Sequence, residues 1–479
     1  MSLIGIYNHP KAAKMAYFGL YAQQHRGQQS AGIVSRRPPK AAGEELQIFE
    51  HIGLGLVPDV FPEEVLNQLR GSRAIGHVLY SRSGSPRLRD AEPFRVQHRG
   101  LDLSIAHNGA LLNAESLRLR LEKAGAIFHT NTDSEIFAHL IIEALEKGDN
   151  LSEAVISACK AVRGAFCLLI LANDQMIAVR DPLGIKPLSL GRVEKTDTWV
   201  IASETCAFDL LEAQVTRSIR PGEMIIIDAA ENLNAPNLTS IQWANSPGCK
   251  HCVFELVYFA RPDSVVFGEE VYSCRKRMGI QTAKEAPCKA DCVMPLPDSG
   301  VYFALGYAQG TGLPYEHAMI RNHYVGRTFI QPTQEMRSFD VRIKLNPVSG
   351  FIRGKRVVIA DDSIVRGTTV RGRTSHLRES GAKEVHFRVS SPPVKFPCLY
   401  GVDFPSREEL IAVHKSNEEI REYIGLDSLH HLSLEGLKEV LAKPESFCYA
   451  CFDGNYPILP DDEEENAANC ESCVKPAHK

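Results

Sequence analysis

The first half of the chain is patterned in short apolar runs, each bounded by Gly, Asp or Asn. These runs are rich in β-branched residues, which predicts strands. Two longer segments, 114–125 and 133–148, repeat their apolar residues with a helical period. Strands that pair with strands, followed by helices, predict a layered α+β domain over residues 1–232. The expected strands lie in SRAIGHVLY (72–80), LDLSIAHNG (101–109), AFCLLILAND (165–174), MIAVRD (176–181), TWVIASE (198–204) and EMIIIDA (223–229).

The pattern changes after a polar stretch at 231–250, which is rich in Asn, Pro and Ser and predicts a linker. Beyond it, apolar runs alternate with helical patterns such as RGTTVRGRTSHLRESG at 366–381. That alternation predicts an α/β domain with a parallel sheet over residues 250–457. An acidic run follows, and residues 458–479 are expected to form a solvated tail. The expected buried strands lie in KADCVMPLP (289–297), LPYEHAMI (313–320), GKRVVIADD (354–362) and AKEVHFRVSS (382–391).

Composition and charge narrow the function classes. The 479 residues carry a net charge of −4, so no global basic field favours nucleic acid or an anionic membrane as partner. The opening residues lack the pattern of a signal peptide, and no apolar run is long enough for a membrane span, so we expect a cytoplasmic protein. The 13 cysteines are odd in number, and close pairs such as Cys448 and Cys451 favour a metal or cluster over disulfides.

The segment VVIADDSIVRGTT, at 357–369, predicts a phosphate site. A buried strand ends at Asp361 and Asp362, a turn of small and hydroxyl residues follows, and a helix is expected to begin at about Thr369. Ligands of open α/β sheets bind at the carboxyl ends of strands, and a helix N-terminus offers free N–H groups to a phosphate. Two adjacent carboxylates would repel that phosphate directly, so they are expected to face sugar hydroxyls or a divalent cation.

Three motifs together, DDSIVRGTT, PDSG at 297–300 and NHYVGRTFIQP at 322–332, resemble those of the amidophosphoribosyltransferase family. The resemblance runs from Gly5 to about Pro457. It implies a type I phosphoribosyltransferase domain in the second half of the chain. It also implies the first step of de novo purine synthesis, in which 5-phosphoribosyl 1-pyrophosphate, glutamine and water give 5-phosphoribosylamine, glutamate and pyrophosphate.

The resemblance also implies roles for individual residues of the second domain. Asp361 and Asp362 hold the ribose hydroxyls and, with Ser299, a Mg²⁺ ion. YVGRTFIQP forms a lid that keeps water from the reacting sugar. Arg327 and Lys344 contact the pyrophosphate, unless they are ordinary surface charges. His323 departs from the family's usual Arg. The 5′-phosphate is cradled by Arg366, Gly367, Thr368 and Thr369.

Four further motifs in the first half resemble a class II glutamine amidotransferase domain, which has the N-terminal-nucleophile hydrolase fold. They are QHRGQQSAG (24–32), GHVLYSRSG (76–84), HNG (107–109) and HTNTDSE (129–135). In such domains an N-terminal cysteine thiol attacks glutamine. The resemblance implies that Asn108 and Gly109 stabilise the oxyanion, that Asp133 holds the substrate amino group, and that Arg26 shapes the pocket.

This pocket departs from the family at several positions. Met1 stands where the nucleophilic cysteine is expected, and Ser2 stands where the family has Gly. Leu79 replaces an arginine that pairs with the glutamine carboxylate, and Arg82 replaces a hydroxyl residue. Two independent losses in one pocket favour a real decline of glutaminase activity over an altered start with some residual site. The chain is therefore expected to use free ammonia.

Four cysteines align with the ligands of a 4Fe–4S cluster found in one branch of the family: Cys252, Cys398, Cys448 and Cys451. A zinc site and buried free thiols are the alternatives. The family resemblance also implies a homo-oligomer, often a tetramer, inhibited by purine nucleotides. A regulatory protein that binds phosphoribosyl pyrophosphate without catalysis is the rival function. The enzyme is favoured, because the PDSG motif, the lid sequence and both aspartates are all present.

Overall fold

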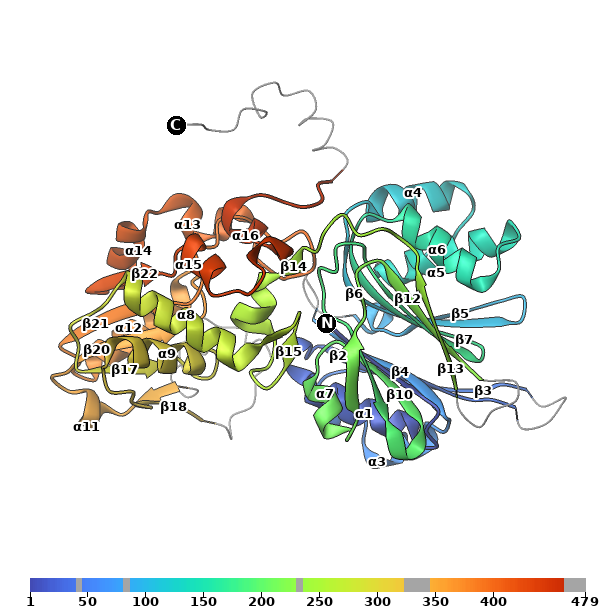
Figure 1. Ribbon diagram of the computed structural model, residues 1–479, viewed down its shortest axis with the longest axis horizontal. Helices are drawn as coiled ribbons and strands as arrows, with labels where there is room; N and C mark the ends of the chain where they lie inside the picture. The colour runs from blue at the N-terminus through green and yellow to red at the C-terminus, as the bar shows by residue number, and fades with distance from the viewer. Residues whose placement is uncertain (40–44, 81–86, 230–235, 323–344, 461–479) are drawn as a thin grey trace, which may run out of the picture.

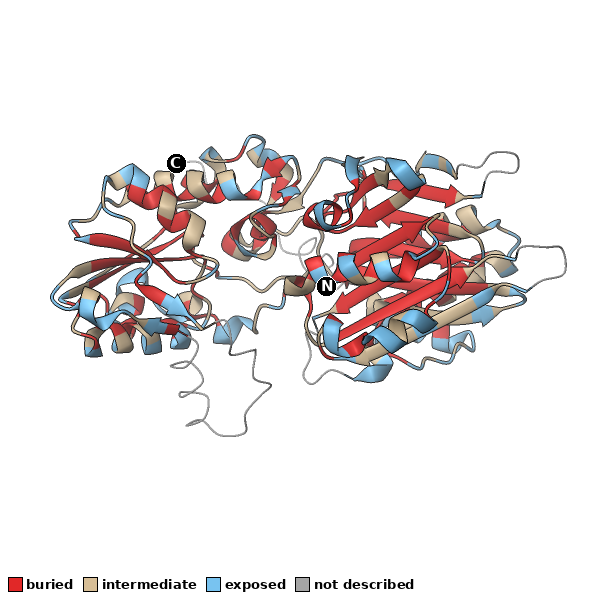
Figure 2. Cartoon of the chain, turned by 90° about the horizontal axis from the view of Figure 1, so that it is seen from below, coloured by how far each residue is buried: buried red, intermediate tan, exposed pale blue. Residues whose placement is uncertain are grey.

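The computed structural model describes residues 1–39, 45–80, 87–229, 236–322 and 345–460. Figure 1 shows two domains side by side, and the C-terminal segment (red) lies where they meet. The strands of both domains are largely buried, whereas the outer helices expose one face, as Figure 2 shows. Within the described residues, none of the helices has the length and apolar character needed to cross a bilayer.

The N-terminal domain is built on two packed antiparallel sheets. Leu3 and Ile75 of one sheet meet Leu169 and Ile225 of the other in a fully buried core. In spatial order, the first sheet contains β11 (Gln214–Ser218), β9 (Ser189–Val193), β10 (Thr198–Ala202), β1 (Ser2–Tyr7), β4 (Arg73–Leu79), β2 (Ser30–Arg37) and β3 (Gln47–Leu54). The second contains β13 (Asn237–Gln242), β12 (Glu223–Asp228), β8 (Gln175–Arg180), β7 (Gly164–Ala172), β6 (Leu101–Leu111) and β5 (Phe94–His98).

Helices cover the outer faces of both sheets. Ile4 of the first sheet packs with Leu20 of α1, and Phe166 of the second packs with Phe137 of α5. The helices on the first sheet are α1 (Ala12–Ala22), α2 (Val57–Val60), α3 (Glu63–Gln68) and α7 (Cys206–Leu210), and those on the second are α4 (Ala114–Lys123), α5 (Asp133–Glu146) and α6 (Leu151–Ala161). The predicted layered α+β domain and its two predicted helices are confirmed.

The C-terminal domain has a four-stranded parallel sheet, as predicted, in the order β17 (Cys292–Pro295), β20 (Arg356–Asp361), β21 (Glu384–Val389), β22 (Ser428–His431). Its central strands are buried on both sides, because helices pack against each face. The helices are α8 (Val271–Glu285), α9 (Val301–Thr311), α11 (Ser349–Ile352), α12 (Thr368–Glu379), α13 (Ile411–His414), α14 (Asn417–Ile424), α15 (Leu434–Glu439) and α16 (Ala450–Asp453).

Several short elements complete this domain. A π-helix, Glu255–Phe259, follows β14 (His251–Cys252), which pairs in parallel with β23 (Phe447–Cys448). Two small antiparallel pairs are formed by β15 (Val265–Val266) with β16 (Glu269–Glu270), and by β18 (Met319–Arg321) with β19 (Leu345–Pro347).

Two expectations about these elements were wrong. Residues 237–242, inside the expected linker, form β13 at the edge of the second sheet. Most of its side chains are solvent-exposed, so it lacks the apolar content that marks the other strands. The run LPYEHAMI does not join the parallel sheet as a strand. It contacts β17 through one bridge, Val293 to Tyr315, and then forms β18, while Ala318 and Met319 pack over the sheet.

Candidate functional sites

The phosphate segment lies at the carboxyl end of β20, as the sequence predicted. Asp361 is its last residue, and the side chains of Asp361 and Asp362 are both largely buried. The Ser299 hydroxyl donates to Asp361 Oδ1 at 3.3 Å, and the Asp362 N–H donates to the same oxygen at 2.9 Å. Ser299 follows β17, the strand that pairs directly with β20. Residues 62 positions apart are therefore brought to one edge of the sheet.

The two carboxylates make this edge strongly acidic. Burial, and then the adjacent Asp362 carboxylate, raise the pKa of Asp361 well above its usual range. The nearest guanidinium, Arg373 Nη1, stands 3.9 Å from Asp361 Oδ2, too far for a hydrogen bond. A buried carboxylate pair of this kind favours a bound cation, and Mg²⁺ prefers one or two carboxylates combined with substrate oxygens. The donor set therefore fits the ion implied by the sequence.

The turn after the aspartates leads into a helix N-terminus that is open to solvent. Gly367, with φ of +74°, precedes α12, and a Cβ there would stand 2.8 Å from Ile411 Cδ1. Thr368 and Thr369 open the helix and are exposed, so their N–H and hydroxyl groups are available to a phosphate. The exposed Arg366 side chain donates to Glu409 at 3.0 Å. The lid residues from His323 onward, with Arg327 and Lys344, lie outside the described residues.

The predicted glutamine pocket gathers around β6 and the start of β1. The Met1 nitrogen donates to the Arg26 carbonyl oxygen at 2.7 Å, and Arg26 Nε donates to the Met1 carbonyl oxygen at 3.2 Å. Burial, and then the charges of Arg26 and Lys186, lower the pKa of the Met1 α-amino group to about 4. The low pKa favours a neutral α-amino group, which is the form that can act as a base. The Met1 side chain, however, has no thiol for that base to activate.

The predicted oxyanion residues, Asn108 and Gly109, are buried near the end of β6. Asn108 is 3% exposed, and its Nδ2 has no hydrogen-bond partner among the residues that the structure describes. Gly109 has φ of +156°, and a Cβ there would stand 1.9 Å from the Ala165 carbonyl oxygen, so only glycine fits. Asp133 begins α5, and its Oδ2 accepts from the Leu111 N–H at 3.0 Å. Leu79 ends β4 beside Ser30 of β2.

A buried polar group beneath this pocket was not anticipated from the sequence. The Glu92 carboxylate accepts from the His107 N–H at 2.8 Å and from the Ser134 hydroxyl at 2.7 Å. The His77 ring lies 3.6 Å from the same carboxylate. Burial raises the pKa of Glu92 to about 8. The only sequence signal was a charged residue between two of the motifs, which is too common on protein surfaces to be informative.

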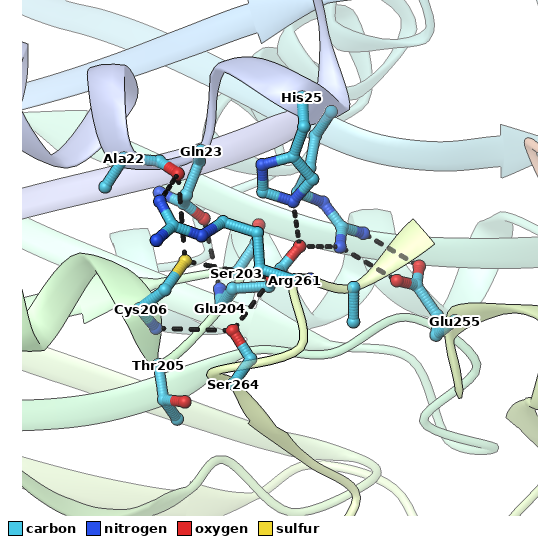
Figure 3. A network of polar contacts seen from close by, with 12 residues as sticks. Ala22, Gln23, His25, Ser203, Glu204, Thr205, Cys206, Glu255, Arg261 and Ser264 are labelled. Carbon is cyan, nitrogen blue, oxygen red and sulfur yellow. Dashed lines mark hydrogen bonds and ion pairs between the residues drawn. The ribbon is translucent and has the colours of Figure 1, made fainter. Parts of the chain in front are cut away.

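Arg26 also joins the two domains, through the carboxylates of Glu204 and Glu255 that are labelled in Figure 3. Its guanidinium donates to Glu204 at 2.5 Å and, through two nitrogens, to Glu255 of the C-terminal domain at 2.8 and 2.7 Å. Glu204 also accepts from the Arg261 N–H and the Ser264 hydroxyl, each at 2.9 Å. This buried network was not predicted, because its members lie up to 229 residues apart.

The four aligned cysteines, which we call the thiol tetrad (Cys252, Cys398, Cys448 and Cys451), converge where the domains meet. Cys252 and Cys448 are register partners in the parallel pair β14–β23, and Cys451 follows in α16. The Tyr400 N–H donates to Cys398 Sγ at 3.3 Å. Burial, and then the charges of the other three cysteines, raise the pKa of Cys451 well above its usual range.

The arrangement of the four tetrad cysteines decides whether they fit a single metal ion or an iron–sulfur cluster. Across the described ranges, no three His, Cys, Asp or Glu side chains are grouped as ligands of a single metal ion. A 4Fe–4S cluster differs, because each thiolate binds its own iron and the four sulfurs need not meet at one point. Four partly buried thiols whose charges act on one another therefore fit a cluster better than a zinc ion. Cys470 and Cys473 lie outside the described residues.

Comparisons with known proteins agree with both domains. Residues 87–209 match the glutamine amidotransferase domain family, and residues 275–391 match the phosphoribosyl transferase domain family. The chain is 47% identical to amidophosphoribosyltransferase 1, chloroplastic, of Arabidopsis thaliana, over 96% of this chain and 78% of the relative. It is 43% identical to the amidophosphoribosyltransferase of Methanothermobacter thermautotrophicus, over 99% of this chain and 98% of the relative.

A solved structure shows the same arrangement over both domains. Glutamine phosphoribosylpyrophosphate amidotransferase from B. subtilis, complexed with ADP and GMP, superimposes with a TM-score of 0.87 at 42% identity. The match covers 96% of this chain and 99% of that structure. Agreement of this extent, at this identity and in both domains, shows that the chain belongs to the amidophosphoribosyltransferase family.

Proposed function

We propose that this enzyme takes its nitrogen from free ammonia and that its glutamine pocket hydrolyses glutamine poorly or not at all. As an amidophosphoribosyltransferase, the chain forms 5-phosphoribosylamine from 5-phosphoribosyl 1-pyrophosphate in the first step of de novo purine synthesis. The observation that carries the proposal is the contrast between the two sites. The carboxylates and helix N-terminus of the phosphate site are in place, whereas the glutamine pocket has Leu79 where an arginine is expected and no thiol at residue 1.

In this proposal the phosphate site works mainly by positioning and charge. Asp361 and Asp362 orient the ribose hydroxyls, while the N–H groups and hydroxyls of Thr368 and Thr369 bind the 5′-phosphate. Arg366, Arg327 and Lys344 supply further positive charge to the phosphates. Ser299, Asp361 and Asp362 would hold Mg²⁺, which neutralises charge on the departing pyrophosphate. The proposed glutamine pocket retains four of its expected residues: Asn108, Gly109, Asp133 and Arg26.

We further propose that the thiol tetrad holds a 4Fe–4S cluster with a structural role. Three of its four cysteines come from the last 82 residues of the chain (398–479), so a cluster would tie that segment to β14. We also propose that purine nucleotides inhibit the enzyme, which is supported by the ADP and GMP named with the B. subtilis structure. A homotetramer and a cytoplasmic location are parts of the same proposal, to be tested by light scattering and by cell fractionation.

The test is a steady-state assay of the full chain with Mg²⁺ and 5-phosphoribosyl 1-pyrophosphate, supplied with either glutamine or an ammonium salt. Pyrophosphate release with ammonium and negligible glutamate release from glutamine are expected. Glutamate release at a rate comparable to pyrophosphate release would overturn the ammonia proposal. Purified protein should also absorb at about 400 nm and contain iron and sulfide if the cluster is present.

A further inference from the structure

The N-terminal domain contributes a loop, residues 181–188, to the surroundings of the thiol tetrad. The Lys250 N–H donates to the Leu183 carbonyl oxygen at 2.9 Å, and the Cys252 N–H donates to the Ile185 carbonyl oxygen at 3.0 Å. Leu183 and Ile185 share an apolar cluster with Tyr400, against which Cys252, Cys398 and Cys448 pack. The strand that carries Cys252 is therefore bonded to the other domain directly beside the tetrad.

Lys186, the next residue of this loop, is a buried cation whose charge is only partly balanced. Its side chain is 4% exposed, and its ammonium stands 3.9 Å from Glu255 Oε1, beyond hydrogen-bond reach. That carboxylate already accepts two hydrogen bonds from Arg26. An ammonium withdrawn from water costs several kcal/mol unless an opposite charge compensates it.

The tetrad cysteines are the other groups near Lys186 that can become negatively charged. Burial by itself would lower the pKa of Lys186, but the charges of Cys252, Glu255 and Cys398 raise it overall. A cluster held by four thiolates carries net negative charge, and electrostatic contacts of this kind set its stability and potential. The ammonium thus lies where a bound cluster would supply its missing counter-charge.

We propose that Lys186 is the electrostatic partner of the cluster, so that the glutamine amidotransferase domain sets how long the cluster survives. The inference rests on the proposed cluster. It has a consequence that an ordinary ion pair with Glu255 would not have. Lys186 stabilises the chain when the cluster is bound and destabilises it when the cluster is absent, because the ammonium is then left buried with one shared carboxylate.

The experiment compares the full chain with Lys186→Met and Lys186→Arg, all purified without oxygen. Lys186→Met keeps the length of the side chain but removes its charge, and Lys186→Arg keeps the charge. Lys250→Met is the matched control, since Lys250 also borders the tetrad region but is partly exposed and bonded to the Glu445 carbonyl oxygen. The readouts are loss of absorbance at about 400 nm in an iron chelator, and denaturant unfolding with and without the cluster.

Lys186→Met is expected to lose its cluster on the order of tenfold faster than the unaltered chain, whereas Lys186→Arg and Lys250→Met stay within about twofold. Without the cluster, Lys186→Met should be at least as stable as the unaltered chain. An unchanged rate of cluster loss, or equal destabilisation of both forms, would overturn the role of Lys186 alone. An unaltered chain that contains no iron would overturn the cluster proposal and this inference together.

Discussion

The phosphate site and the predicted glutamine pocket differ in how many of their expected functional side chains are present. At the phosphate site, the groups that would contact substrate are present and their frame is intact: two buried carboxylates, a neighbouring hydroxyl and an open helix start. At the predicted glutamine pocket, Gly109 has the conformation that its close contact with β7 requires, and Asn108 Nδ2 has no partner among the described residues. Two positions there differ from what the family resemblance leads us to expect: Met1, where a thiol is expected, and Leu79, where an arginine is expected.

If the glutamine pocket is inactive, as we propose, the residues that differ are ones that the fold does not need. Gly109 and Arg26 also serve the fold, because one avoids a clash between β6 and β7 and the other binds carboxylates of both domains. Replacing either would disturb packing or leave buried charges unpaired. Leu79 sits at the end of a strand and is half-buried, so an apolar side chain there costs the fold little. The proposed loss of glutamine hydrolysis would therefore leave the outline of the pocket in place.

The largest effect is expected at the phosphate site. Asp361→Asn removes a negative charge that orients ribose and metal, and we expect ammonia-dependent pyrophosphate release to fall by roughly 100-fold or more. Release should be measured at saturating Mg²⁺. Asp291→Asn is the control and should stay within about twofold, because Asp291 is an exposed partner of Arg356 at the amino end of β20, the opposite end of that strand from Asp361. Activity of Asp361→Asn near that of the unaltered chain would mean that this edge is not the reacting site.

The intact frame of the glutamine pocket can be tested by stability. Gly109→Ala forces a Cβ to 1.9 Å from the Ala165 carbonyl oxygen in a backbone conformation that L-residues avoid. We expect the free energy of unfolding to fall by about 3 kcal/mol, measured in urea. Gly100→Ala is the matched control, because its φ is +83° but nothing lies within 4 Å of the added atom. That variant should lose about 1 kcal/mol.

Much of this architecture could be predicted from the sequence, and the failures have physical causes. The strand, the turn and the start of the helix were predicted correctly for the segment VVIADDSIVRGTT. Its apolar run, its small residues and its hydroxyl residues all favour the same local structure. The edge strand β13 was mistaken for linker because an exposed strand need not be apolar. Glu92, Glu204 and Glu255 were missed because their partners come from distant segments, and a single carboxylate in a sequence does not reveal its burial.

The buried Glu92 carboxyl group predicts how the stability of the N-terminal domain depends on pH. Its pKa is raised to about 8, so the folded chain binds a proton there that the unfolded chain releases above its ordinary pKa. Stability should therefore be fully present at low pH and decline between about pH 4.5 and pH 8, by at most roughly 1.4 kcal/mol per pH unit. Glu92→Gln removes the charge; its amide oxygen can still accept from the His107 N–H, and its amide nitrogen can donate to the Ser134 hydroxyl oxygen, which reverses the second bond. The variant should remove this part of the decline and gain about 2 kcal/mol at pH 8, measured by urea unfolding across pH.

The smallest effect concerns the lost carboxylate contact. If the frame still accepts glutamine, Leu79→Arg should restore a guanidinium at the end of β4 and tighten glutamine binding by about tenfold, as a charge-assisted contact near a solvent-open strand end allows. Binding should be measured by calorimetry, since residue 1 carries no thiol and no hydrolysis is expected. Leu79→Met controls for the longer side chain without charge. Equal affinity in both variants would show that the pocket has changed beyond its two missing side chains, and that the frame seen at Asn108 and Gly109 no longer serves glutamine.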